Sequence, residues 1–350
     1  MTGKREVSDT FMAEQKKEYA AVDLFKMVCA FLVMLIHTKP FEPVFLADAA
    51  LGILTRFAVP FFFTAAGCFF YQKLSDHPEE SAGILKGYLL RLFRFYAIWF
   101  LIFRVQDCVM SGCIRPLPFY VRQFFFTTDG SPLWFVPALI WAIILVYLLS
   151  RFLKPAFVFL IGMLCLLTGY TFSTLLGITG NSAVFHLIKP FTDFIGIQGG
   201  LFFAFPYTAM GALLSTVRIR KQYRKDSLAV MLFLALLGAE SLVAVTCLKA
   251  PFTFLWLSAV PMTWFTARLM LSAELREKKI YYDIRKISTL FYVMHVIILK
   301  AVRYFIGRSG IADRMHLILT VFTFLFTMTA CLCVLRLSGN RKFSWVKYLM

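Results

Sequence analysis

The sequence predicts an all-α integral membrane protein, a bundle of about ten transmembrane helices with both termini in the cytoplasm. Hydrophobic residues make up 60% of the chain and charged residues only 16%, so a polar surface could not cover its apolar side chains in water. Apolar runs long enough to cross a hydrocarbon core of ~30 Å recur along the whole length. Basic residues gather at the alternate connections between these runs, which is typical of cytoplasmic loops.

The expected helices follow from the continuity of the apolar runs. Continuous runs of about 20 residues must satisfy their backbone internally as helices, whereas a β-barrel would show alternating segments of about 10 residues. The predicted spans cover residues 20–38, 52–71, 88–105, 133–150, 155–176, 199–217, 228–247, 251–271, 288–306 and 316–336. The domain organisation is therefore an N-terminal cytoplasmic tail over 1–19, a membrane domain over 20–336 and a short cytoplasmic tail over 337–350.

Most of the 37 basic residues lie on one side of this predicted bundle. They occupy the N-terminal tail, residues 73–94, 151–154, 218–225 and 268–286, and the C-terminal tail. The net charge of +18 does not indicate nucleic acid as a partner, because the charges are spread over many short loops. Anionic headgroups of membrane lipids are the expected partners.

The cysteines and the metal-ligating residue types predict no metal site. Six of the eight cysteines fall in apolar runs, where they act as small buried hydrophobes. Cys108 and Cys113 lie in the predicted outer loop, and whether they pair is open.

The first span, DLFKMVCAFLVMLIHTKPF from Asp23, carries a polar stripe. His37 follows Lys26 by eleven positions, so on a helix they share a face, roughly 16 Å apart. Asp23 lies one turn before Lys26. Either Lys26 snorkels to the cytoplasmic headgroups and His37 ends the span, or the two line a cavity that suits abstraction of a proton from a hydroxyl.

Lys26, ten residues and His37 resemble the basic-x10-His signature of the acyltransferase 3 family of integral membrane O-acyltransferases. Arg91 and Arg94 resemble the Arg-x-x-Arg motif of that family in the third span. RFAVPFFFTAAGCFF from Arg56, PLWFVPALI around Trp134 and LFYVMHVII around Tyr292 and His295 are similar to three further stretches. The resemblance covers nearly the whole chain. It is strong to the membrane domains of the serine racemases found in vancomycin-resistance operons.

This resemblance implies a function. A family member transfers an acyl group, commonly acetyl, from cytoplasmic acyl-CoA to a hydroxyl of an envelope glycan or a lipid-linked acceptor, at a bacterial cell membrane. His37 is then the general base, Lys26 a second catalytic residue that polarises the carbonyl or holds a phosphate, and Arg91 and Arg94 bind the phosphates of acetyl-CoA.

Two of these assignments have an alternative. The positive-inside rule alone accounts for Arg91 and Arg94 at a cytoplasmic helix end. Lysine at position 26, where the family more usually has arginine, keeps the charge but loses the bidentate fork, so equivalence of role stays open.

Six more residues are candidate lining residues of the cavity: Asp23, Arg56, Trp134, Glu240, Tyr292 and His295. Glu240 is an acid within an apolar run, Arg56 is near the outer end of its span, and Tyr292 and His295 lie one turn apart on one face. Each also has a purely structural interpretation. Gly199, Gly200 and Gly211 are expected to mark close helix contacts and not a phosphate loop.

Two other classes of function remain. The bundle could transport serine or another small polar solute, although no internal repeat typical of transporters is visible. It could also be a non-catalytic partner or sensor, in which case His37 would be dispensable.

Overall fold

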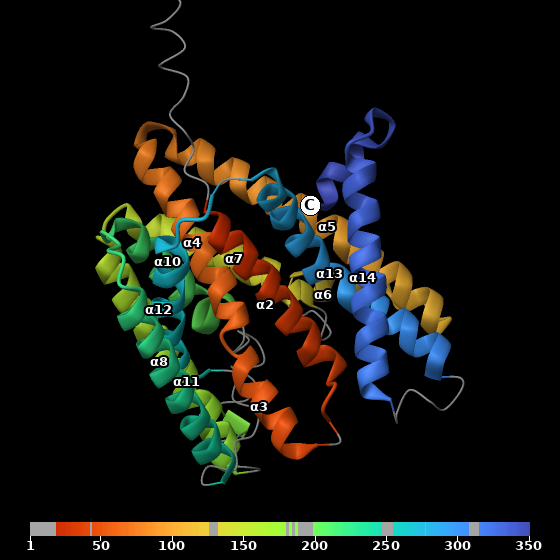
Figure 1. Cartoon of the computed structure of the whole chain (residues 1–350), viewed down its shortest axis with the longest axis horizontal. Coiled ribbons are helices and arrows are strands. Elements are labelled where there is room, and N and C mark those ends of the chain that lie inside the picture. The colour runs from red at the N-terminus through yellow and green to blue at the C-terminus, as the bar shows by residue number, and fades with distance from the viewer. Residues whose placement is uncertain are drawn as a thin grey trace, which may run out of the picture.

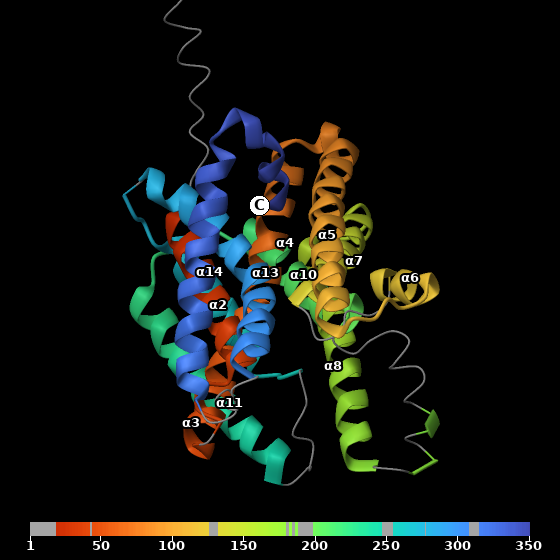
Figure 2. The same ribbon diagram turned by 90° about the vertical axis from the view of Figure 1, so that its right-hand side faces the viewer.

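The computed structural model describes residues 19–42, 44–125, 132–179, 182–183, 186–187, 199–246, 255–276, 278–307 and 315–350. This part of the chain is helical, as predicted (Figures 1 and 2). Its α-helices are α2 (Ala20–Thr38), α3 (Phe45–Thr55), α4 (Ala58–Asp76), α5 (Ser81–Ser111), α6 (Leu117–Phe125), α7 (Phe135–Ser150), α8 (Pro155–Thr179), α10 (Phe205–Thr216), α11 (Tyr223–Thr246), α12 (Ala259–Ser272), α13 (Lys279–Gly307) and α14 (His316–Ser338). Short helical turns are η1 (Pro78–Glu80), η2 (Pro132–Trp134), η3 (Gly200–Ala204) and η4 (Arg341–Leu349).

Within the described residues, seven helical stretches are long and apolar enough to cross a membrane. They are Ala20–Thr38, Phe45–Asp76, Pro132–Ser150, Pro155–Leu176, Tyr223–Ala244, Lys279–Phe305 and His316–Ser338. The other three predicted spans contain helices that do not meet the same test: α5 carries several charged side chains, and Gly200–Thr216 and α12 are shorter. The observed fold is thus an all-helical, multi-pass bundle, and the count of ten spans stays a prediction.

Helix boundaries differ from the predicted ones where polar residues extend a helix beyond its apolar part. Helix α5 has 31 residues and α13 has 29, each several residues longer than its apolar run. Helices α3 and α4 form one apolar stretch that is interrupted at Arg56 and Phe57. Parts of the predicted 251–271 and 228–247 spans, including Cys247, lie outside the described residues.

Helix α10 is enclosed by other helices. Its residues Phe205–Ala212 are all buried, which is expected of a helix that is apolar on every side. It follows the π-helical turn η3 and packs closely on α4, α7 and α8 (Figures 1 and 2).

Two glycines allow the close crossing of α4 and α10. A Cβ at Gly67 would lie 2.0 Å from the Thr208 carbonyl oxygen, and one at Gly211 would lie 2.0 Å from the Thr64 carbonyl oxygen. At Gly200 a Cβ would lie 2.7 Å from Trp141 Cβ. The prediction of close helix contacts at Gly200 and Gly211 is confirmed.

Helices α2 and α13 begin at the end of the bundle where α14 finishes, which is uppermost in Figures 1 and 2. The C-terminal segment η4 packs on α5 there: Trp99 Nε1 donates a hydrogen bond to the Leu349 carbonyl at 3.1 Å, and Val346 is buried. The sequence had indicated only a short tail at this place.

Candidate functional site

The polar stripe predicted on the first span lies on a single unbroken helix. Helix α2 runs from Ala20 to Thr38 and packs against α4 and α13. It ends because Lys39 adopts a left-handed conformation (φ 48°) ahead of Pro40, with the Lys39 N–H bonded to the Leu35 carbonyl. His37 is therefore in the last turn of α2, with Lys26 about three turns earlier, so the predicted spacing is retained.

His37 contacts His295 of α13. The centroids of the two imidazole rings are 5.3 Å apart, with 41° between the ring planes. Arg303, farther along α13, donates from Nη2 to the His37 backbone carbonyl at 3.3 Å. Two histidines that the sequence placed in different spans thus meet in the fold.

His295 is fully buried. Its Nδ1 lies 3.0 Å from the Phe291 carbonyl oxygen, while Nε2 has no hydrogen-bond partner among the described residues. One ring nitrogen is therefore engaged by its own helix, and the other is left over in a buried position next to His37.

Near the start of α2, Lys26 lies in a different environment. Asp23 is buried and accepts two hydrogen bonds from Arg285 of α13, from Nε at 2.9 Å and from Nη2 at 2.6 Å. The Lys26 ammonium lies 5.1 Å from the centroid of the Phe69 ring of α4. The sequence indicates only that Arg285 is one of the basic residues of a cytoplasmic loop. Its pairing with Asp23 is not visible there, because the two residues are 262 positions apart.

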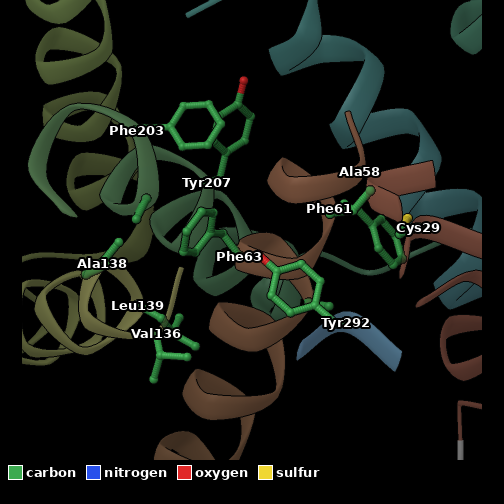
Figure 3. Close-up of a cluster of buried hydrophobic side chains, with 14 of the residues drawn as sticks. Cys29, Ala58, Phe61, Phe63, Val136, Ala138, Leu139, Phe203, Tyr207 and Tyr292 are labelled. Atoms are coloured by element: carbon green, nitrogen blue, oxygen red, sulfur yellow. The ribbon is translucent and has the colours of Figure 1, made fainter. Parts of the chain in front are cut away.

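Tyr292 lies in an aromatic cluster with Phe63 and Phe203 that joins α4, α13 and η3 (Figure 3), and Trp134 of η2 packs on the same two phenylalanines. The Tyr292 hydroxyl donates to the Pro132 carbonyl at 3.2 Å, and its ring lies 5.4 Å from Phe62 and 5.6 Å from Phe135. The structure therefore connects both residues with the surroundings of His295, since Tyr292 also contacts the His295 ring.

Arg56 and Glu240 lie elsewhere. Both Glu240 carboxylate oxygens accept backbone N–H groups at the start of α12, from Leu257 at 2.8 Å and from Ser258 at 2.9 Å. The Arg56 guanidinium lies 5.3 Å from the Trp256 ring. A carboxylate at a helix N-terminus satisfies free N–H groups, so the structure gives Glu240 a capping contact.

Arg91 and Arg94 are exposed on α5, away from α2. Arg91 lies over the Tyr88 ring at 5.1 Å, and Arg94 lies over Tyr348 of η4 at 5.7 Å while its Nε donates to the Leu90 carbonyl. They share one stretch of helix, as the motif predicts, but neither contacts the histidine pair.

Sequence reasoning missed a charged cluster between α5 and α13. Asp107 bonds Lys300 at 2.7 Å and Arg104 at 2.9 Å, and Gln106 donates to the Ile297 carbonyl at 2.7 Å. The sequence signal that could have indicated this cluster is the presence of an acid, Asp107, and a base, Lys300, near the ends of two long apolar runs. Their pairing depends on the packing of α5 against α13.

Cys108 and Cys113, whose pairing the sequence leaves open, are both free thiols in the structure. The Cys108 sulfur lies 3.2 Å from the Tyr120 hydroxyl, and Cys113 is exposed. Among the described residues no three His, Cys, Asp or Glu side chains are grouped to hold a metal ion.

A protein-family model described as an acyltransferase domain matches residues 19–336. The chain belongs to the acyltransferase 3 family. Together with the seven apolar helices, this membership identifies an integral, multi-pass membrane protein of a family that is associated with transferase activity.

Two curated relatives from Enterococcus faecalis, both named amino-acid racemase, are similar to this member of the acyltransferase 3 family. One is 25% identical over 61% of the chain and the other is 24% identical over 80%. The aligned parts are 30% and 41% of the length of these relatives, so the chain spans well under half of each. No solved structure matches the chain.

Proposed function

We propose that this acyltransferase 3 family member transfers an acyl group, commonly acetyl, from cytoplasmic acyl-CoA to a hydroxyl of an envelope glycan or another extracytoplasmic acceptor, including a lipid-linked one. The observation that carries the proposal is the position of His37: it ends an unbroken helix that also bears Lys26, and it contacts the buried His295. A general base needs such a fixed position, with a neighbour that orients it.

The transfer conserves atoms and charge. His37 takes the proton of the acceptor hydroxyl as the oxygen forms a bond to the thioester carbonyl carbon. The carbon–sulfur bond then breaks, and the CoA thiolate leaves with a proton returned by His37. The products are the O-acyl ester and free CoA.

Three cationic side chains have further roles in this proposal. Arg91 and Arg94 are exposed, and two guanidinium groups on one helix face suit the phosphates of CoA. Lys26, on α2 one turn from the Asp23–Arg285 pair, polarises the thioester carbonyl or holds a phosphate in this proposal.

The orientation belongs to the same proposal. The membrane domain over 20–336 crosses a bacterial cell membrane ten times in this proposal. Both tails, over 1–19 and 337–350, lie in the cytoplasm. The distribution of basic residues supports this orientation. Acyl-CoA is then on the side of Arg91 and Arg94, and His37 is near the outer interface.

The test uses the purified full chain in nanodiscs. Binding of acetyl-CoA and release of CoA with candidate glycan acceptors are measured for wild type and for His37→Ala. We expect binding to survive in the variant and transfer to fall by about 100-fold or more, the usual contribution of a general base. Absence of acyl-CoA binding across several chain lengths would reject the proposal.

A second candidate function is transport of serine or another small polar solute. The similarity to proteins named amino-acid racemase favours it, because such proteins act on amino acids. Uptake of labelled serine into proteoliposomes tests it, and uptake that is unaffected by His37→Ala would favour transport over acyl transfer.

A further inference from the structure

The buried ring of His295 leaves one nitrogen without a function in the fold. Its Nδ1 is 3.0 Å from the Phe291 carbonyl oxygen. A carbonyl oxygen can only accept a hydrogen bond, so Nδ1 carries the hydrogen. In the neutral imidazole, Nε2 then holds a lone pair and can only accept.

That lone pair is in an apolar setting. The His295 side chain is 0% exposed, and no donor reaches Nε2 within the described parts of the chain. A buried polar atom without a partner loses its bonds to water and gains none in the protein, so such atoms are rare in folded structures.

His37 is the polar side chain that contacts this ring. The ring centroids are 5.3 Å apart, whereas the other rings in contact with His295, Phe291 and Tyr292, lie 6.4 and 6.3 Å away. The Tyr292 hydroxyl is already used, since it donates to the Pro132 carbonyl. Arg303 binds the His37 backbone carbonyl, which leaves the His37 ring free of that guanidinium bond.

In the structure the two rings are in contact but not hydrogen-bonded. We propose that His295 is a positioning residue for His37, and that its Nε2 lone pair accepts a hydrogen bond from a ring N–H of His37 when the His37 ring turns toward it during the reaction. This bond fixes the tautomer of His37, so that the other His37 nitrogen is the one that takes the proton of the acceptor hydroxyl. The inference rests on the proposed function and adds to it a third group that orients the base.

The bond also stabilises the charged form of His37. When His37 has taken the proton, both of its ring nitrogens carry hydrogen, so one of them is able to donate to the His295 lone pair. The imidazolium therefore keeps a partner inside the bundle until it returns the proton to the CoA thiolate. His295 itself neither gains nor loses a proton in this step.

Three variants separate this role from packing. His295→Gln places an amide oxygen near the position of Nε2, and so keeps an acceptor. His295→Asn keeps an amide donor near the position of Nδ1 but has nothing at Nε2, and His295→Phe keeps only the ring. His316→Asn, in the first turn of α14, is a control because the His316 ring lies against Glu42, with Nδ1 at 3.5 Å from the carboxylate, and no ring contact joins it to His37 or His295 among the described residues.

We expect kcat to fall about 10- to 100-fold in His295→Asn and His295→Phe, with the KM for acetyl-CoA unchanged, because misorienting a base costs about that much. His295→Gln should recover part of kcat, and His316→Asn should match wild type. Equal losses in all three His295 variants at unchanged thermal stability would overturn the proposal.

The protonation state of His295 Nε2 can be measured independently of turnover, by 15N NMR. The chain has only five histidines, so selective 15N-histidine labelling with one substitution per sample assigns each ring. We expect His295 to be neutral, with hydrogen on Nδ1 and an unprotonated Nε2 whose resonance shifts in His37→Ala. A protonated Nε2, or one that does not respond to His37→Ala, overturns the proposal.

The two proposals fail in different ways. If wild type transfers no acyl group while the Nε2 resonance responds to His37→Ala, the pairing stands and the acyltransferase function fails. If transfer proceeds and Nε2 is protonated or silent, the function stands and the positioning role fails.

Discussion

Arg285 of α13 places both Nε and Nη2 on a single carboxylate oxygen of Asp23 in α2, at 2.9 and 2.6 Å. The Asp23 side chain is 4% exposed and that of Arg285 is 41% exposed. The two residues are 262 positions apart in the chain, so their ion pair joins two helices that are distant in sequence. Asp23 lies one turn before Lys26 on α2.

Asp23→Asn should destabilise the bundle by about 1–3 kcal/mol. Removing one partner of a buried ion pair costs about 3–5 kcal/mol, and the exposure of Arg285 reduces this cost. The midpoint of thermal unfolding in nanodiscs measures the change. A double-mutant cycle with Arg285→Gln should show a coupling, and additive effects of the two substitutions would contradict a direct pair.

Gly211→Ala should separate α4 from α10. The added Cβ would lie 2.0 Å from the Thr64 carbonyl oxygen, so the backbones must move apart, at a cost of roughly 1–3 kcal/mol or more. Gly87→Ala on α5 is the control, because nothing lies within 4 Å of a Cβ there. Equal unfolding midpoints for the two variants would show that the close approach is not needed.

Glu240→Ala should loosen the start of α12. The variant leaves the Leu257 and Ser258 N–H groups without their carboxylate, a loss of about 0.5–2 kcal/mol for a helix cap. Hydrogen exchange over residues 257–262 should accelerate, and Glu240→Gln should fall between the variant and wild type. Unchanged exchange together with a loss of transfer would instead give Glu240 a role at the ligand.

Arg91→Gln and Arg94→Gln should each weaken CoA binding about tenfold, because a hydrogen bond to a charged group contributes about 1.5–3 kcal/mol. Binding of an acyl-pantetheine, which has no phosphate, should stay the same. Lys86→Gln, an exposed position on the same helix, is the control for loss of charge. Equal weakening by Lys86→Gln would favour the positive-inside explanation.

Cys113 tests the orientation of the chain. It is an exposed free thiol in the connection after α5, which the N-in arrangement places outside the cytoplasm. A membrane-impermeant maleimide should label it in intact cells, and Cys113→Ser should remove that label. Labelling of Cys113 only after permeabilisation would reverse the orientation.

The sequence alone determined the helical class and the placement of Lys26 and His37 on one helix. Both depend on local properties: the length of an apolar run and the periodicity of the helix, which hold for any neighbours. Pro40 after the His-Thr-Lys triplet also marks where α2 ends, since proline does not continue a helix.

Only the tertiary structure decided which polar groups meet. His37 beside His295, Arg285 on Asp23, Asp107 on Lys300 and Glu240 at the start of α12 each join different helices. Such contacts depend on how closely helices approach and at which rotation. Gly67 and Gly211 show this for another pair of helices, since they set the approach of α4 to α10. A single sequence states which residues are able to pair, whereas packing selects the partners.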